Sequence, residues 1–202
     1  MVTSFTDAEN FLIKKGYPWE PLIKKIGPCR LKISDDLLPY QSIIKSIFYQ
    51  QLHPKAGDAI FTRFMQIFEN KFPTPKELIQ RKKEFEQIGL SKRKRETIMQ
   101  INLLIDQQKL PISLQDFTRN EIETQYTQVK GVGIWTVQMM LIFNQGFLDI
   151  MPCTDFAIRK NFSTLMNLEN MITPKKLEAE TLSLKPYRSI AAWYLWQLPQ
   201  TL

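Results

Sequence analysis

The sequence has little cysteine, histidine and glycine, and it has no long apolar segment. Cys29 and Cys153 are the two cysteines among 202 residues. They cannot build a disulfide framework, which favours a reduced compartment. No apolar run approaches the ~20 residues that cross a bilayer, and residues 1–7 lack the basic and apolar regions of a secretion signal. We therefore expect an intracellular protein, in the cytoplasm and nucleoid or in a nucleus, with no membrane partner.

Basic residues outnumber acidic ones. The chain has 27 lysines and arginines against 20 acidic residues, a net charge of +7, and its pI is about 9.4. This charge favours an anionic partner such as nucleic acid, although many basic proteins bind none. The hydrophobic content of 44% can fill a core, and the length fits one medium domain or two closely packed lobes.

Apolar residues recur at helical spacing along most of the chain. Ile98, Ile101 and Ile105 share one helical face, as do Ile43 and Ile47. Residues 31–33 alternate, but the segment is too short to found a sheet. The pattern predicts an all-α protein, with helices over residues 5–15, 20–26, 39–51, 56–67, 76–81, 91–105, 120–128, 135–144, 155–165, a short one after 174, and 188–197.

Several residues are of the type that begins a helix. Thr74 precedes Pro75, and Thr173 precedes Pro174, a typical arrangement of a cap and a first helical residue. We expect the N-terminal helix to be capped by Thr6 or Asp7. The other expected helix starts are Ser91 for the helix that follows Gly89, and Thr118 or Asn120 for the helix that ends near residue 128.

The most informative stretch covers residues 129–155. Gly131 and Gly133 stand one residue apart before an apolar helix, and glycine tolerates positive φ and the close approach of another backbone. The N–H groups at the start of that helix suit a phosphate. Such a turn is usually only a loop. Asp155, at the start of the next helix, is by itself most simply a helix cap. The order and spacing of these pieces are more specific than any one of them.

This combination resembles the helix-hairpin-helix (HhH-GPD) DNA glycosylase superfamily, and within it the 3-methyladenine DNA glycosylase II family. Three further segments are similar to segments of that family: Ser-Ile-Phe-Tyr-Gln-Gln-Leu-His at 46–53, Ile-Gly-Leu-Ser-Lys-Arg-Lys at 88–94, and Lys-Pro-Tyr-Arg-Ser-Ile-Ala-Ala-Trp-Tyr-Leu-Trp at 185–196. They occur in the family's order and cover most of the chain.

The resemblance implies one glycosylase domain over residues 1–202 with two helical lobes and a cleft between them. One lobe is expected from roughly residue 40 to 145, and the other from the N-terminal segment together with roughly 146–202. Larger members of the superfamily carry an N-terminal β-rich domain. Little sequence precedes Tyr40, so we expect the short form without that domain.

The resemblance implies hydrolysis of the N-glycosidic bond between an alkylated purine, such as 3-methyladenine or 7-methylguanine, and deoxyribose. Asp155 matches the catalytic aspartate of the family. Its carboxylate would stabilise the positive charge that develops on the sugar, and would orient or deprotonate the attacking water. Asp149 is the neighbouring competitor, and we place it as a loop residue or as a charge that supports the site.

The resemblance also identifies residues that handle the base. Its DNA wedge is within Gln51, Leu52 and His53, with His53 favoured because a flat ring can stack within DNA. A local role at a helix end is the alternative for His53. The base pocket is expected to use aromatic faces, and ordinary core packing is the alternative for each of them. The base-pocket candidates are Trp135 and Trp196, then Tyr49 and Tyr40; we prefer packing for Trp193.

The DNA backbone contacts are expected at the hairpin and at one basic helix start. They are Lys130, Gly131, Gly133, Ile134 and Thr136, with Lys92 and Lys94. Lys130 and Ile134 depart from the commonest hairpin pattern, which has proline and a basic residue there. The resemblance also allows a sodium or potassium ion at the carbonyls near Gln128, Gly131 and Gly133.

Trp135 stands where relatives that also cut the DNA backbone have a lysine, so we expect a monofunctional enzyme without lyase activity. Two cysteines cannot hold the iron–sulfur cluster of other branches, which takes four, and no other cofactor is expected. The expected partner is double-stranded DNA that contains alkylated bases, bound by a monomer.

Two other hypotheses remain open from the sequence. The first is a non-catalytic DNA-binding relative that recognises distorted duplexes. The second is a helical protein-interaction module with a basic surface, which leaves the four matching segments unexplained. The intact Asp155 favours the enzyme.

Overall fold

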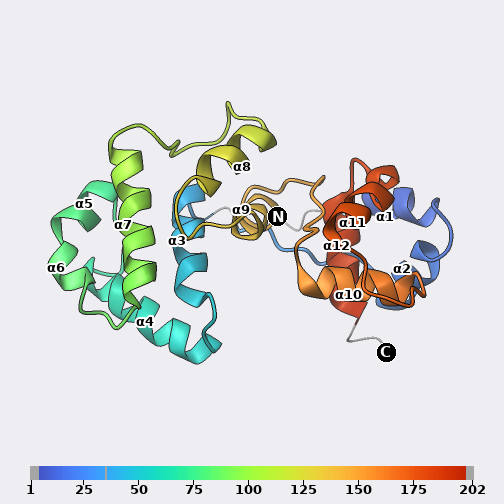
Figure 1. The fold of residues 1–202 in the computed structure, drawn as a ribbon, viewed down its shortest axis with the longest axis horizontal. Coiled ribbons are helices and arrows are strands. Elements are labelled where there is room, and N and C mark those ends of the chain that lie inside the picture. Colours follow the sequence, from blue (N-terminus) through green and yellow to red (C-terminus); the bar gives the residue numbers. More distant parts are fainter. Residues whose placement is uncertain (1–4, 35, 199–202) are drawn as a thin grey trace. The chain divides into compact units, whose positions relative to one another are not determined.

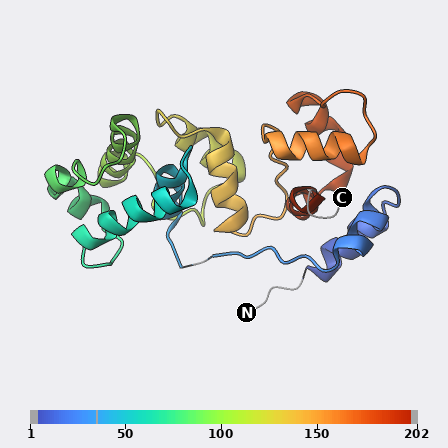
Figure 2. The same ribbon diagram turned by 90° about the horizontal axis from the view of Figure 1, so that it is seen from below.

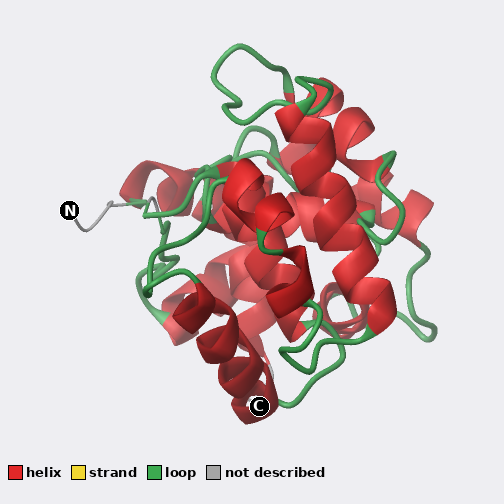
Figure 3. Ribbon diagram, turned by 90° about the vertical axis from the view of Figure 1, so that its left-hand side faces the viewer, coloured by secondary structure: helices red, strands yellow, loops and turns green. Residues whose placement is uncertain are grey.

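The structure is a computed structural model that describes residues 5–34 and 36–198, and these residues form α-helices joined by turns, with one short 3₁₀ helix and no strand (Figure 3). The predicted all-α class is therefore confirmed. Residues 1–4 of the segment inspected for a secretion signal lie outside the described residues. No helix in the described part of the chain is long and apolar enough to cross a membrane.

The helices follow one another closely along the chain (Figure 1). The first seven are α1 (Thr6–Ile13), α2 (Trp19–Ile26), α3 (Pro39–Tyr49), α4 (Pro54–Ile67), α5 (Pro75–Gln80), α6 (Lys82–Phe85) and α7 (Lys92–Asp106). The others are α8 (Arg119–Thr127), α9 (Ile134–Phe143), α10 (Phe156–Leu165), α11 (Pro174–Glu180), the 3₁₀ helix η1 (Leu182–Leu184) and α12 (Arg188–Gln197).

The chain forms two compact units. One runs from Ser34 to Met140, and the other joins the described residues up to Ile33 with those from Leu141 onward. The division between Met140 and Leu141 falls inside α9. The second unit therefore brings together segments from both ends of the sequence.

The 34–140 unit is built on the packing of α3, α4, α5 and α7, and α3 and α7 run side by side (Figures 1 and 2). A cluster of phenylalanine rings fills the space between these helices. Phe64 is its centre, with ring centroids 5.0 Å from Phe48 and 5.9 Å from Phe85. Aromatic contacts at such distances add to the burial of the rings themselves.

The face of α4 that meets this core is displaced by one position at its first turn. The helical spacing of Ala56, Ile60 and Phe64 would place Ala56 inward, but Ala56 is exposed and its neighbour Gly57 is buried. The ring of Tyr49 covers Gly57, and a Cβ at that glycine would lie 2.6 Å from Tyr49 Cδ1. The tertiary contact of an aromatic ring therefore decides which residue of this turn is inside.

Three threonines begin helices as expected. Thr74, Thr118 and Thr173 each accept a hydrogen bond from the backbone N–H three residues on, at 3.3, 3.4 and 3.3 Å. These bonds satisfy N–H groups that the helix itself leaves without acceptors. Thr118, and not Asn120, is the cap of α8.

Two other expected caps were wrong in detail. The residue before α1 is Phe5, with Thr6 and Asp7 inside the helix, and its side chain makes no capping bond. Ser91 does precede α7, but its side chain makes no capping bond either. Short polar residues near a helix start predict its position to within a residue, and tertiary packing sets the final register.

The other unit is held by α1, α2, α10 and α12. Its buried Arg188 donates from Nε to Asp149 Oδ1 at 2.6 Å and from Nη1 to Glu178 Oε1 at 2.7 Å. The Tyr194 hydroxyl lies 3.0 Å from Glu9 Oε1 and 3.0 Å from the Gly27 carbonyl oxygen. These buried polar groups fix the loops to the helical core, because a charge or hydroxyl without partners there is costly.

We predict that the protein loses stability in alkaline solution. Burial raises the pKa of Tyr126 and Tyr194 above the ordinary value of 10.0, and burial with a hydrogen bond to Asp58 raises the pKa of Tyr49 to about 12. At pH values between 10.0 and these raised folded-state pKa values, the tyrosines of the unfolded chain lose phenolic protons that the folded chain keeps. The stabilisation is therefore complete below pH 10.0 and is lost as the pH rises through the folded-state values.

Urea unfolding followed by circular dichroism at a series of pH values measures this loss. A Tyr126→Phe variant, which lacks one of the raised groups, should show a shallower decline. A free energy of unfolding that stays constant up to about pH 11 would contradict the prediction.

Candidate functional site

The turn between α3 and α4 presents the three expected wedge residues to solvent. Gln51 has a positive φ of 55°, and Gln51, Leu52 and His53 are all exposed. His53 begins α4, and its carbonyl accepts the Ala56 N–H at 2.9 Å. Its imidazole makes no capping bond to the helix. The structure thus places all three side chains on one exposed turn, and the choice among them stays a prediction.

The hairpin lies between α8 and α9. The Val132 N–H donates to the Val129 carbonyl at 3.0 Å, and Gly131 has φ of 95°. A Cβ at Gly131 would lie 2.3 Å from Thr97 Oγ1. The expectation that glycine is needed here for positive φ and close approach is therefore confirmed at Gly131.

The surroundings of Gly133 differ from those of Gly131. It does not have a positive φ, it is exposed, and a Cβ there would meet no heavy atom within 4 Å. The protein itself thus does not require glycine at this position. The open space in front of Gly133 lies at the start of α9, where the first N–H groups of the helix have no intrahelical acceptor.

The carbonyl of Gly133 is already engaged. It accepts the N–H groups of Thr136 at 3.0 Å and Val137 at 3.3 Å. The carbonyl that precedes a helix normally accepts its first intrahelical bonds. The expected cation site at the carbonyls near Gln128, Gly131 and Gly133 stays a prediction. Within the described residues no group of three or more histidine, cysteine, aspartate or glutamate side chains forms a metal site.

Two of the expected phosphate contacts point inward. Thr136 is only 3% exposed, and its hydroxyl accepts a hydrogen bond from Gln50 Nε2 at 3.2 Å. Lys94 Nζ donates to the carbonyls of Phe48 at 3.0 Å and Gln50 at 2.6 Å. Both side chains bond to the end of α3, so neither is placed as a contact for an outside anion.

The other basic residues at the start of α7 have different surroundings. Lys92 is exposed and lies 3.9 Å from Glu96, whereas Arg95 Nη1 donates to the Leu90 carbonyl. Arg93, in the same basic run, is exposed as well. It also lines the small cavity described next.

Three segments that were matched separately in the sequence meet at one small cavity of about 140 Å³ in the 34–140 unit. Its walls come from the end of α3, the start of α7 and the hairpin. The lining residues are Ile47, Gln50, Gln51, Ser91, Arg93, Lys94, Thr97 and Gly131. The structure therefore brings together the wedge turn, the basic helix start and the hairpin.

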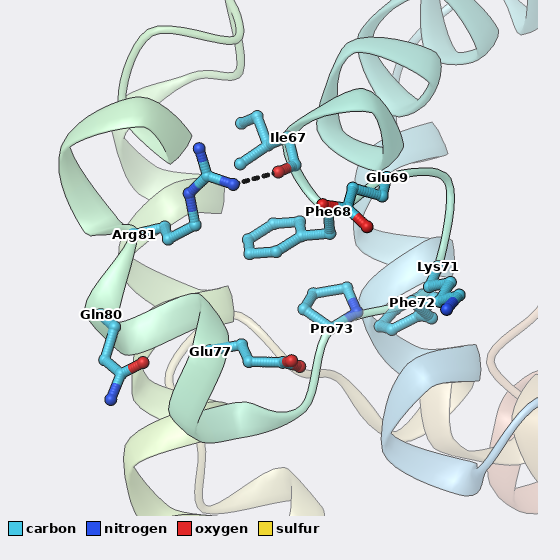
Figure 4. A pocket seen from close by; sticks show the side chains of 9 residues that line it. All are labelled: Ile67, Phe68, Glu69, Lys71, Phe72, Pro73, Glu77, Gln80 and Arg81. Carbon is cyan, nitrogen blue, oxygen red and sulfur yellow. Dashed lines mark hydrogen bonds between the residues drawn. The ribbon is translucent and has the colours of Figure 1, made fainter.

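A larger cavity of about 280 Å³ lies between α4 and α5, in the region shown in Figure 4. The Arg81 guanidinium faces the Phe68 ring there and donates to the Ile67 carbonyl. None of the candidate site residues lines this cavity. It is lined by Ile67, Phe68, Glu69, Lys71, Phe72, Pro73, Glu77, Gln80 and Arg81.

The two tyrosines expected in a base pocket are engaged in packing. Tyr40 is 1% exposed, and its hydroxyl donates to the Pro73 carbonyl at 3.3 Å. The ring of Tyr49 lies against Gly57, and its hydroxyl donates to Asp58 at 2.7 Å. A ring as buried as Tyr40 has no face to offer a base. The alternative of core packing is therefore the better assignment for Tyr40, and the contacts of Tyr49 favour packing as well.

Asp155 is fixed at the start of α10, in the unit that contains residues 141–198. Its Oδ1 accepts the Ile158 N–H at 2.9 Å, and its own N–H donates to the Pro152 carbonyl at 2.9 Å. The expected helix cap is confirmed. A carboxylate at a helix N-terminus is favoured by the helix dipole. Phe156, the next residue, is 66% exposed.

Asp149, the competing carboxylate, is held in the buried ion pair with Arg188. The guanidinium contacts it twice, from Nε to Oδ1 at 2.6 Å and from Nη2 to Oδ2 at 3.2 Å. Such a two-pronged bond fixes the carboxylate in one orientation. Asp149 is therefore a structural charge, and Asp155 is the better candidate for chemistry.

An aromatic pair lies in the same unit as Asp155. Trp196 and Phe143 have ring centroids 5.6 Å apart and an angle of 35° between planes, and both are partly exposed. Helix α12, which carries Trp196, packs on α10, and Asn161 Nδ2 donates to the Leu195 carbonyl at 2.8 Å. Phe143 was missed in the sequence because it lies at the end of an apolar run that also serves the core.

Residues 44–186 match the family described as HhH-GPD superfamily base excision DNA repair protein. The match covers most of the chain, including the hairpin and Asp155. This chain belongs to that family. The predicted membership of the HhH-GPD superfamily is thus confirmed.

Related HhH-GPD proteins match over nearly the whole length. DNA-3-methyladenine glycosylase 1 of Schizosaccharomyces pombe is 36% identical, over 98% of this chain and 89% of its own. The alkylbase DNA glycosidase-like protein mag2 of the same organism is 33% identical, over 98% of this chain and 95% of its own.

Solved HhH-GPD structures agree with the fold. The 3-methyladenine DNA glycosylase Mag1 of S. pombe in complex with abasic DNA superposes with a TM-score of 0.81 at 32% identity, covering 96% of this chain and 97% of that one. The DNA-3-methyladenine glycosidase of Bacillus halodurans superposes with a TM-score of 0.88 at 26% identity, covering 98% and 92%.

We predict that the two hairpin glycines respond differently to substitution. Gly131→Ala should lower the free energy of unfolding by about 2 kcal/mol, because a Cβ at positive φ is strained and would collide with Thr97. Gly133→Ala should change it by less than about 0.5 kcal/mol, because the space there is open. Urea unfolding of the two variants measures the difference, and equal losses would contradict it.

Proposed function

We propose that this chain is a base excision repair DNA glycosylase that hydrolyses the N-glycosidic bond of alkylated purines such as 3-methyladenine and 7-methylguanine. The observation that carries the proposal is the carboxylate of Asp155, held at the start of α10 by the Ile158 N–H at 2.9 Å, at the position that matches the family's catalytic aspartate. The named activities of the two S. pombe and B. halodurans glycosylases support the substrate class.

The carboxylate would act on the charge that appears as the bond breaks. The sugar becomes positively charged in the transition state, and a fixed anion stabilises that charge without having to reorganise. The same carboxylate would orient or deprotonate the attacking water. An alkylated purine such as 3-methyladenine is already cationic and is a good leaving group. One carboxylate can therefore suffice, without a general acid from the protein.

The base has to leave the DNA stack before this chemistry. Extrusion costs a few kcal/mol, and less for a damaged base. We assign the gap-filling role to the exposed turn of Gln51, Leu52 and His53, because a flat or apolar side chain can replace lost stacking. The partly exposed pair of Phe143 and Trp196, in the same unit as Asp155, offers the aromatic faces we propose for the extruded base. Trp135, whose ring is 41% exposed, stays a separate candidate.

The DNA backbone would be held by the hairpin and by the start of α7. The open space at Gly133, beside the half-buried Ile134 and the exposed Lys130, permits a close approach of phosphate to backbone N–H groups. Lys92 and Arg93 are the exposed cations at α7 that we add to this surface. Double-stranded DNA is the proposed partner, bound by a monomer in an intracellular compartment.

We predict that base release depends on the Asp155 carboxylate. Purified protein is incubated with methylated duplex DNA, and free 3-methyladenine and 7-methylguanine are measured by chromatography. Asp155→Asn should lower the single-turnover rate at least about a hundredfold, because it removes the charge. Asparagine caps helices about as well as aspartate, so the variant should keep its melting temperature.

Asp155→Ser is the matched second variant, since serine also caps a helix but carries no charge or amide. Release that survives both substitutions would identify another residue as the catalytic group. Salt-dependent DNA binding by the wild type without release of any damaged base would favour the non-catalytic alternative, to which the "glycosidase-like" name of the 33% identical relative draws attention.

We also predict that the enzyme forms no covalent bond with DNA. The lyase reaction needs an amine that attacks the sugar and forms a Schiff base, and Trp135 has none at the hairpin position. Reaction with damaged DNA in the presence of borohydride should give no trapped complex on a denaturing gel, whereas a bifunctional glycosylase run in parallel should give one. A trapped band would contradict the prediction and identify a lysine at the reaction centre.

A further inference from the structure

The carboxyl end of α3 is held by a lysine from another helix. The last carbonyls of a helix have no intrahelical donors. Lys94, in the first turn of α7, donates from Nζ to the carbonyls of Phe48 at 3.0 Å and Gln50 at 2.6 Å. Its positive charge also complements the negative end of the α3 dipole. The ammonium group thus supplies hydrogen-bond donors to carbonyls at the end of α3 that the helix itself leaves without them.

The same helix end leads directly into the exposed turn. Gln50 caps α3, and Gln51, the next residue, has φ of 55°. The side chain of Gln50 donates to Thr136 Oγ1 on α9 at 3.2 Å. Gln50 is therefore held through its carbonyl by α7 and through its side chain by α9. The turn of Gln51, Leu52 and His53 starts from a residue with little freedom.

Lys94 differs from its neighbour Lys92. Lys92 is exposed, whereas Lys94 is partly buried and lines the cavity of about 140 Å³ beside Gln51 and Gly131. Burial lowers the pKa of the Lys94 ammonium. Its donors are directed at main-chain oxygens of the protein, which leaves Lys92 and Arg93 as the solvent-facing cations of this turn.

We propose that Lys94 is a positioning residue that holds the DNA wedge turn in place, and that it is not a phosphate ligand. This inference rests on the proposed function, because it assigns the turn of residues 51–53 to base extrusion. A side chain that enters a base stack meets resistance, and a turn that yields would lose the geometry that extrusion requires. Lys94 acts on this step through the α3 end and touches no DNA.

The test separates phosphate contact from positioning by two readouts. The first is the salt dependence of binding to undamaged duplex DNA, whose slope falls by about one for each phosphate contact that is lost. The second is the fluorescence of 2-aminopurine placed beside an abasic-site analogue, which reports insertion of the wedge. Single-turnover release of 3-methyladenine is measured alongside.

Lys94→Met is compared with two variants, one in α7 and one beyond its end, that remove the same charge. Lys92→Met is the reference for an exposed cation at the proposed DNA surface. Lys109→Met removes an exposed charge beyond the other end of α7, after Asp106, and controls for net charge. Melting temperatures are recorded for all three.

The expected result is a wild-type salt slope for Lys94→Met together with a fall of about tenfold or more in wedge insertion and in base release. Lys92→Met should show a slope lowered by about one. A lowered slope with normal insertion for Lys94→Met would overturn the proposal and make Lys94 a phosphate ligand. Wild-type behaviour in both readouts would overturn it as well.

Lys94→Arg keeps the proposal testable if Lys94→Met does not fold. Arginine keeps the positive charge, so it would substitute well for a lysine that binds a phosphate group. The planar guanidinium is broader than the ammonium group that it replaces, and the cavity of about 140 Å³ is small. The two carbonyl bonds should therefore be disturbed, so insertion should still fall while the salt slope stays normal. Normal insertion by this variant would then overturn the proposal. Wedge insertion without base release by the wild type would refute the glycosylase activity alone.

Discussion

The 34–140 unit depends on the close approach of Thr97 to the hairpin. The Thr97 hydroxyl donates to the Lys130 carbonyl at 2.9 Å, and only glycine at position 131 leaves room for it. Because the contact joins the main chain of the hairpin to a buried side chain of α7, it fixes the hairpin against that helix. Lys94 of α7 bonds to the Gln50 carbonyl at the end of α3, and the Gln50 side chain bonds to Thr136 of α9. Hairpin, basic helix start and wedge turn form a closed set of contacts.

The other unit holds its two aspartates in different ways. The buried Arg188 forms ion pairs with Asp149 and Glu178. A buried guanidinium is tolerated only when its partners are complete. Asp155 accepts a hydrogen bond from the Ile158 N–H at the start of α10. An arginine neutralises the carboxylate that it binds, whereas a peptide N–H orients a carboxylate and leaves its charge.

Much of the fold could be predicted because its signals are local. The spacing of Ile98, Ile101 and Ile105 predicts α7, and Thr74 and Thr173 predict the starts of α5 and α11. A helix cap and an apolar helix face involve only residues that are close in the sequence. The order of motifs indicated the family and the role of Gly131. The placement of Lys94 could not be predicted, because its acceptors are 44 and 46 residues away.

Side chains that serve both packing and chemistry were the hardest to assign. Tyr40 looked like a pocket residue and is buried, whereas Phe143 looked like core and is partly exposed. Aromatic residues are suited to both places, and only the tertiary fold decides between them. Thr136 is a polar example, because its hydroxyl accepts a hydrogen bond from Gln50 inside the protein.

The position of Asp155 as a helix cap has an evolutionary consequence. The start of α10 requires only a side-chain acceptor for the Ile158 N–H, and asparagine or serine caps a helix about as well as aspartate does. Aspartate and asparagine codons differ by a single base. A gene of this kind is therefore one mutation away from a product that folds normally and lacks only the carboxylate that we propose as catalytic. If Asp155 has that role, selection for the reaction, and not for the fold, has to retain it.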